Sequence, residues 1–326
     1  MLLSALLALQ RRWARTLGRV IRRLIVAQGV PVTPQRRQQI AVQLHRETLP
    51  YRQQSYEAAV TRIREFDPHL TPAPIRDYPV AAVVSVLERA TEPPARVSSP
   101  RARVTVAPAE LDPLSRRQAR RRVNVTAAPR SPAAVREVVN RVSVTMGRHI
   151  QQAGRDAIVD TADGAGEEVG WARLLSGAEN CAFCAMLASR GPVYRSDKSA
   201  TSVVGRPRGN RELGEAYHDN CDCETVLVRR GQPWEGQAEY ERLERLWIAA
   251  SSLDGEPRLA FNRAFRRGQK DPDLLKEIER LWEDSTEGLT GTDATDAFVA
   301  AVRANPPAAL AAARKLQESK HNDRSS

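Results

Sequence analysis

Apolar residues recur every three or four positions over much of the chain, and this is the period of one face of an α-helix. In residues 1–30 the apolar positions run from Leu2 to Ile25, and arginines fill much of the other face. The same spacing predicts further helices over about 33–66, 131–160, 235–250 and 257–282, and an alanine-rich helix over about 306–316. We expect Pro50 to kink or divide its helix and Pro272 to open a fresh one. The pattern indicates a mainly α fold.

Shorter elements are expected elsewhere. Residues 80–87 fit either a short helix or a strand, and we favour the helix. Residues 181–189 are predicted to form a short helix that Glu179-Asn180 can cap. Strands are expected at 193–194 and 223–228, so this part of the chain is predicted to be a small α+β module.

Between the helical regions the composition changes to proline, serine, arginine and valine with little periodicity, which is typical of an extended or poorly ordered linker. The sequence therefore divides into a basic amphipathic helix at 1–30, a helical region at 31–90, a Pro/Arg-rich linker at 91–130, a Cys/His-containing module at 131–232, a helical C-terminal region at 233–317 and a disordered tail at 318–326.

The chain is strongly basic, with a formal net charge of +11, which favours a polyanionic partner. Nine arginines precede the first acidic residue, Glu47. Five more gather within seven positions of the linker: Arg116, Arg117, Arg120, Arg121 and Arg122. These five either form a solvated face of the linker or bind double-stranded DNA or an acidic partner.

The helix at 1–30 has two interpretations. It docks its apolar stripe on the rest of the protein or on an assembly partner, or it binds an anionic membrane surface or nucleic acid. Residues 1–10 lack the charged region and cleavage site of a signal peptide, and no apolar run approaches the ~20 residues of a spanning helix. We therefore expect a soluble protein with no integral membrane segment.

All four cysteines of the 326 residues lie in one stretch, as Cys181-x2-Cys184 and Cys221-x-Cys223, and His218 stands three positions before Cys221. Paired short spacings of this kind point first to a metal, and the two halves together could complete a tetrahedral zinc site with a structural role. Because five residues compete for four positions, His218 or Cys223 could lie outside the set of direct zinc ligands.

Two other interpretations of the cysteines stay open. They are buried thiols that pack or cross-link the two halves, or one of them is a nucleophile activated by a neighbouring histidine. Only His218 is close in sequence, and the chain has no Gly-x-Ser-x-Gly, His-Glu-x2-His or phosphate-binding glycine motif. The sequence therefore favours a protein that is not an enzyme.

Three blocks carry a family resemblance: Trp171-Ala-Arg173, Ser176–Tyr194, and Tyr217-His-Asp-Asn-Cys-Asp-Cys223. They resemble the MuF-like minor capsid, or head morphogenesis, proteins of tailed bacteriophages, in the form found in phages of actinobacteria. The closing His-x2-Cys-x-Cys matches the terminal His/Cys signature of that family, whereas the Cys181-x2-Cys184 half is a feature of the actinobacterial branch.

The resemblance implies that residues 131–232 are a MuF-like module and that the protein is a structural part of the phage head near the portal. It implies the portal protein and other head proteins as partners, contact with packaged double-stranded DNA, assembly in the host cytoplasm and a final location in the virion. Some relatives are called capsid maturation proteases. A protease is therefore one alternative, and a nucleic-acid-binding accessory protein outside the virion is another.

Overall fold

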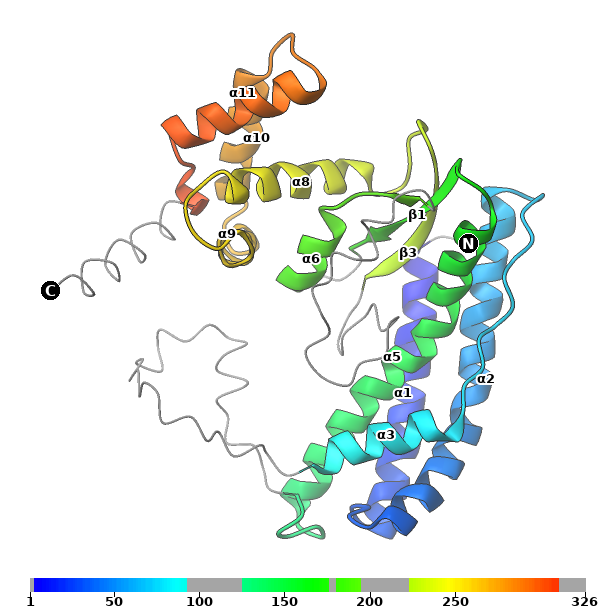
Figure 1. Cartoon of the computed structure of the whole chain (residues 1–326). Coiled ribbons are helices and arrows are strands. Elements are labelled where there is room, and N and C mark those ends of the chain that lie inside the picture. Colours follow the sequence, from blue (N-terminus) through cyan, green and yellow to red (C-terminus); the bar gives the residue numbers. More distant parts are fainter. Residues whose placement is uncertain (1–2, 93–124, 176–179, 195–222, 311–326) are drawn as a thin grey trace, which may run out of the picture. The chain divides into compact units, whose positions relative to one another are not determined.

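A computed structural model describes residues 3–92, 125–175, 180–194 and 223–310, and Figure 1 shows them as a mainly helical chain. The predicted fold class is confirmed. The elements are α1 (Leu3–Gln28), α2 (Pro34–Phe66), α3 (Val80–Thr91), α5 (Pro132–Gly164), β1 (Val169–Leu174), α6 (Ala182–Ala188), β2 (Val193–Tyr194), β3 (Glu224–Arg229), α8 (Gln237–Ser251), α9 (Pro257–Gly268), α10 (Asp273–Ser285) and α11 (Gly291–Ala304). Most of the predicted linker at 91–130, and the whole tail at 318–326, lie outside the described residues.

Internal contacts divide the chain into two compact units. The first, here called the helical unit, comprises the described residues of Met1–Glu65 and Pro74–Ala157. The second, here called the thiol unit, comprises the described residues of Phe66–Ala73, Ile158–Ala216 and Cys221–Ser326. Each unit has a hydrophobic core of its own.

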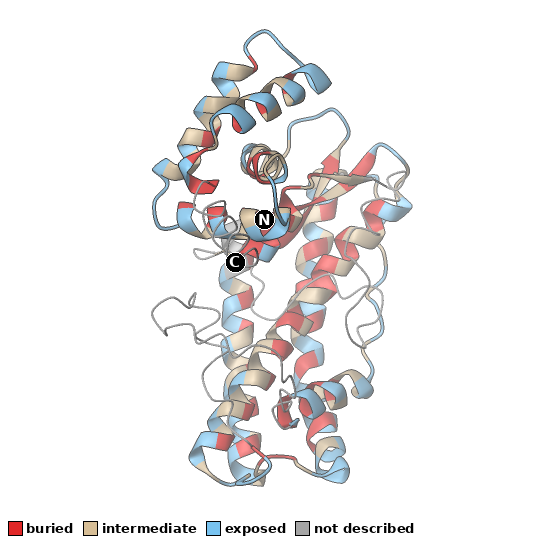
Figure 2. Cartoon of the chain, turned by 60° about the vertical axis from the view of Figure 1, so that its left-hand side comes forward, coloured by how far each residue is buried: buried red, intermediate tan, exposed pale blue. Residues whose placement is uncertain are grey.

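The core of the helical unit is built from α1, α2, α3 and the N-terminal part of α5. Figure 1 shows α1, α2 and α5 running side by side with the shorter α3 across them. Buried and exposed positions alternate along these helices with a helical period (Figure 2), so each helix turns one apolar face to the core. The favoured helix at 80–87 is confirmed, and it continues to Thr91.

Small residues let the long helices of this unit approach closely. A methyl group built on Gly147 of α5 would lie 3.6 Å from Cβ of Ala14 in α1, which is ordinary contact. At Gly154 the approach to α2 is tighter, because the same methyl group would lie 2.7 Å from the carbonyl oxygen of Ser55. Backbone atoms cannot yield easily, so glycine is required at this crossing.

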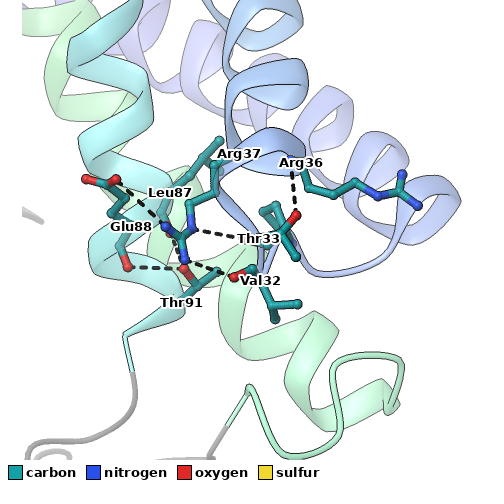
Figure 3. Close-up of polar contacts among 8 residues, drawn as sticks. Val32, Thr33, Arg36, Arg37, Leu87, Glu88 and Thr91 are labelled. Atoms are coloured by element: carbon teal, nitrogen blue, oxygen red, sulfur yellow. Dashed lines mark hydrogen bonds and ion pairs between the residues drawn. The ribbon is translucent and has the colours of Figure 1, made fainter.

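Arg37 ties the start of α2 to α3 (Figure 3). Its guanidinium donates to the carbonyl oxygens of Pro31 and Val32 at 3.2 and 2.9 Å, and it lies 3.7 Å from a carboxylate oxygen of Glu88. The hydroxyl of Thr33 accepts from the backbone N–H of Arg36 at 3.3 Å, which caps α2 directly before Pro34. This arrangement explains why α2 begins where it does.

Pro50 does not divide α2, since the helix runs unbroken from Pro34 to Phe66. Proline removes one backbone donor and crowds the preceding turn, so the continuity must come from packing. Leu44 and Thr48 before Pro50, and Arg52 after it, are all buried. The tertiary contacts of these flanking turns hold the helix together across the proline.

The thiol unit contains a three-stranded antiparallel sheet in the order β2-β1-β3. The central strand, β1, was not predicted from the sequence. It pairs with β3 from Val169↔Arg229 to Leu174↔Glu224. Nearly all of its residues are buried, so it lacks the alternation of polar and apolar residues by which half-buried strands are found.

Helices α6, α8, α9, α10 and α11 form the core of the thiol unit. The predicted helices at 235–250 and 257–282 are confirmed, the second as α9 and α10, with Pro272 directly before α10. Helix α11 was not predicted, although Ala294, Phe298 and Val302 recur on one face and are buried. The predicted helix at 306–316 extends beyond the described residues.

No described helix has the length and apolar character to span a membrane.

Candidate thiol site

Three elements of the thiol unit bring cysteines and an arginine together. Strand β1 supplies Arg173, the residue directly before β3 is Cys223, and the first turn of α6 supplies Cys181 and Cys184. Cys181 itself is the N-cap of α6, because its backbone is extended and its Sγ accepts a hydrogen bond from the backbone N–H of Cys184 at 3.2 Å. The cap predicted at Glu179-Asn180 was wrong by one residue. The short helix after it is confirmed.

Cys184 and Cys223 form the centre of the site. Their Sγ atoms are 3.7 Å apart, and only 3% and 1% of these residues are exposed. A disulfide would bring the sulfurs to about 2.05 Å, so the pair is in contact without a bond. In a tetrahedral zinc site with Zn–S distances of about 2.3 Å, two sulfurs are about 3.8 Å apart. The spacing of this thiol pair therefore fits one edge of such a tetrahedron.

A buried arginine donates a hydrogen bond to the thiol pair. The Nη1 of Arg173, which is buried, donates to the Sγ of Cys223 at 3.2 Å. Burial and then the positive charge of Arg173 lower the pKa of Arg190 from its ordinary value, so a second guanidinium is close enough to be repelled by the first. Positive charge beside a sulfur favours the thiolate, which is the form that binds metals.

The surroundings of α6 hold the site in place. The side chain of Gln269, just after α9, donates to the carbonyl oxygen of Asn180 at 2.7 Å. At the other end, Gly191 has a φ of +72° and its N–H donates to the carbonyl oxygen of Ala188. A methyl group built on Gly191 would lie 2.7 Å from the ring of Tyr240 in α8. The helix is thus fixed at both ends by α8 and α9.

The structure brings together some of the predicted metal ligands and leaves others undescribed. Cys184 and Cys223 meet, and Cys181 lies three positions from Cys184 in the cap of the same helix. His218 and Cys221 lie outside the described residues. Among the residues that the structure describes, no group of three or more His, Cys, Asp or Glu side chains is placed to hold a metal ion. The complete ligand set remains a prediction.

Two findings concern arginines. The predicted nucleic-acid patch of Arg116, Arg117, Arg120, Arg121 and Arg122 lies outside the described residues and remains a prediction. Arg173, by contrast, was not named as a site residue from the sequence. A usable signal was its position, because it is a charged residue within the otherwise apolar run Val169–Leu175.

A second buried polar cluster lies in the helical unit. The hydroxyl of Tyr78 is 2.9 Å from Nδ1 of His149, and the Arg52 guanidinium lies over the Tyr78 ring, 4.2 Å from its centroid. Burial, with the charges of Arg148 and Arg52, lowers the pKa of His149 to about 3. Burial also raises the pKa of Tyr78 well above its ordinary value. The His149 imidazole and the Tyr78 hydroxyl are therefore both neutral. Beside them lies an open cleft of about 400 Å³, lined by Arg52, Arg76 and Asp77 among others.

Comparison with known proteins finds phage relatives. A family described as "VG15 protein" matches residues 98–250, the range that holds α5, the sheet, α6 and α8. The "Gene 15 protein" of Mycobacterium phage D29 is 37% identical over 123 residues, which cover 32% of this chain and 45% of that protein. The "Gene 15 protein" of Mycobacterium phage L5 is 30% identical over 161 residues, which cover 41% of this chain and 54% of that protein.

The chain thus spans about half the length of the curated relatives that it matches. These matches support a phage protein family. No solved structure matches the chain. Residues 98–250 contain every predicted Cys/His ligand and the five clustered arginines, so the candidate chemistry lies in the part that matches the VG15 family.

Proposed function

We propose that this chain is a minor capsid, or head morphogenesis, protein of a tailed phage that acts as a structural component of the head near the portal. The observation that carries the proposal is the similarity to two mycobacteriophage proteins, together with the match of residues 98–250, which include the blocks from Trp171 to Cys223, to the VG15 family. The portal protein and other head proteins are its proposed partners, and the virion, assembled in the host cytoplasm, is its proposed location.

The geometry of the thiol pair supports a structural role over a catalytic one. A nucleophile must reach its substrate, whereas Cys184 and Cys223 are almost wholly buried and contact each other. Cys181 is more exposed, but its sulfur accepts the capping hydrogen bond of α6. The Cys184–Cys223 contact therefore joins α6 to the segment that leads into β3, and Cys181 caps α6.

A structural zinc ion is the proposed cofactor. Cys184 and Cys223 would supply two thiolates at a separation that suits tetrahedral coordination, with Cys181, His218 and Cys221 as the candidates for the remaining positions. When bound, zinc would cross-link segments that are distant in the sequence. Arg173 would offset the negative charge of the thiolates through its hydrogen bond to Cys223.

The proposal is tested by searching for the protein in purified particles of the phage that encodes it. We expect peptides of this chain in the particle fraction at a low, reproducible ratio to the major capsid protein after density-gradient purification. Its presence in the infected-cell lysate together with its absence from the particles would overturn the proposal, and would favour an accessory protein that binds nucleic acid outside the virion.

A second measurement separates the structural role from a maturation protease. In the folded protein near neutral pH, Cys184 and Cys223 should be alkylated much more slowly than free cysteine, and Cys181 faster than either. Unfolding in denaturant should remove the difference. Alkylation of one cysteine much faster than free cysteine, together with loss of capsid-protein cleavage but not of folding in its Ser variant, would establish the enzyme instead.

A further inference from the structure

Helix α1 has two sharply different faces. One face carries the apolar residues, and Leu6, Trp13, Leu17, Ile21 and Ile25 are all buried. The other carries six arginines, all exposed: Arg11, Arg12, Arg15, Arg19, Arg22 and Arg23. At 3.6 residues per turn these six lie within an arc of about 120° and along about 18 Å of helix. They are called the α1 arginine face below.

The apolar face of α1 is already occupied. Leu17, Ile21 and Ile25 belong to the same core as residues of α2, α3 and α5, and they are at most 1% exposed. A helix that lies in a membrane surface must instead bury its apolar face among the lipids. This contact is not open to α1 while the helical unit is folded, which argues against the membrane interpretation of the sequence.

The α1 arginine face forms no ion pair with the part of the chain that the structure describes. The sequence contains no Asp or Glu before Glu47, and none of the six arginines forms an ion pair with a residue that the structure describes. Of the six, Arg19 donates to the hydroxyl of Thr16. Since α1 is held on the core by its other face, the charges are displayed on a rigid support.

Two features favour duplex DNA over a single strand. Proteins that bind single strands stack bases on exposed aromatic rings, and the one aromatic residue of α1, Trp13, is buried on the apolar face. A row of guanidinium groups without aromatic partners suits instead the regularly spaced phosphates of a duplex, which carries one charge per ~1.7 Å of its axis. Arginine also binds phosphate oxygens through two parallel hydrogen bonds.

We infer that the α1 arginine face binds the phosphate backbone of double-stranded DNA without reading its sequence. This inference goes beyond the proposed structural role and uses residues outside the range 98–250 that matches the VG15 family. It also differs from the interpretation of the linker cluster at 116–122, so the two patches can be tested separately.

The test compares the full-length protein with the variant Arg15→Gln/Arg19→Gln/Arg22→Gln on a labelled duplex of mixed sequence, over a range of salt concentrations. The logarithm of the association constant falls with the logarithm of salt by about 0.9 per phosphate neutralised. We therefore expect the slope of the triple variant to be shallower than that of the wild type by up to about 2.7. Replacement of the same three arginines by lysine keeps the positive charges, so most of the wild-type slope should remain.

The matched control removes the same number of charges from exposed positions of the thiol unit, as Arg258→Gln/Arg263→Gln/Lys270→Gln. Its slope should equal that of the wild type. Equal loss of slope in both triple variants, or an unchanged slope in the α1 variant, would overturn the inference, as would a wild type that binds anionic vesicles but not DNA. Thermal unfolding of each variant checks that the fold is kept. The proposed function is tested by detecting the protein in purified phage particles, which is a separate measurement. This inference and the proposed function can therefore fail independently.

Discussion

Arg173 of β1 donates a hydrogen bond to the sulfur of Cys223, 50 positions later in the chain, at 3.2 Å. The bond joins the end of the central strand to the start of β3, and Cys223 in turn contacts Cys184 of α6. The hydrogen bond and the thiol contact together link β1, the residue before β3 and α6.

The first prediction concerns zinc. Full-length protein purified under reducing conditions should contain about one equivalent of zinc. The Cys184→Ser variant should lose the zinc, because it lacks one of the two paired sulfur ligands. Metal analysis by plasma mass spectrometry, after dialysis against metal-free buffer, checks the content.

Met186→Leu is the matched control for this experiment. Met186 is buried in the same short helix but offers no thiol, so its replacement by a residue of similar volume should leave the zinc content unchanged. Wild-type protein without zinc, or Cys184→Ser protein with a full equivalent, would show that the cysteines only pack.

The second prediction isolates the contact between Gly191 and Tyr240. Gly191→Ala forces a methyl group to 2.7 Å from the Tyr240 ring and places alanine at a φ of +72°. Gly231→Ala has nearly the same φ, +71°, but nothing within 4 Å of the new methyl group. The control should cost about 1 kcal/mol in free energy of unfolding, and Gly191→Ala about 1–3 kcal/mol more. Urea denaturation measures both, and equal losses would mean that Tyr240 moves aside freely.

The third prediction concerns acid stability. His149 has a folded pKa of about 3 because it is buried beside Arg148 and Arg52, whereas its ordinary value is 6.5. Between these values the unfolded chain binds a proton that the folded chain does not, so the free energy of unfolding falls as the pH is lowered from 6.5 towards 3. The loss from this one group is about 2 kcal/mol between about pH 7 and pH 5.

His149→Gln tests this assignment, because glutamine cannot be protonated but can still accept a hydrogen bond from Tyr78. Stability at the two pH values, measured by urea titration, should fall by about 2 kcal/mol less in the variant than in the wild type. Carboxylates elsewhere titrate equally in both proteins. Identical pH dependence in the two proteins would show that folding does not change the pKa of His149.

The fourth prediction separates the roles of Arg37. Arg37→Met removes two hydrogen bonds to backbone carbonyl groups and should destabilise the helical unit by about 2 kcal/mol. Glu88→Gln removes only an ion pair at 3.7 Å whose carboxylate side chain is 48% exposed, and should cost less than about 0.5 kcal/mol. Amide hydrogen exchange in α3 reports both effects. Larger loss of protection in Glu88→Gln would reverse this ranking.

The helices were largely predictable because a helix bonds each residue to a near neighbour and repeats its apolar face every three to four positions. This is why α1, α2, α5, α8, α9 and α10 were predicted close to their observed positions. The division of the helix at Pro50 was predicted wrongly, because burial of the turns on either side of it outweighs the missing backbone bond.

The strands were less predictable, for the opposite reason. The central strand β1 depends on partners at 193–194 and 224–229 that no local pattern reveals, and it is buried on both faces. The two predicted strands that flank it are confirmed, although β3 begins one residue after Cys223.

By itself, the sequence determined that the chain is mainly helical, that its cysteines form two short-spaced pairs, and that α1 has an apolar and a basic face. Only the tertiary structure decided that Cys184 meets Cys223, that Arg173 donates to that pair, and that the apolar face of α1 is used inside the protein. Periodicity and spacing are properties of neighbouring residues. Burial and contact depend on segments far apart in the chain, which the packed core alone brings together.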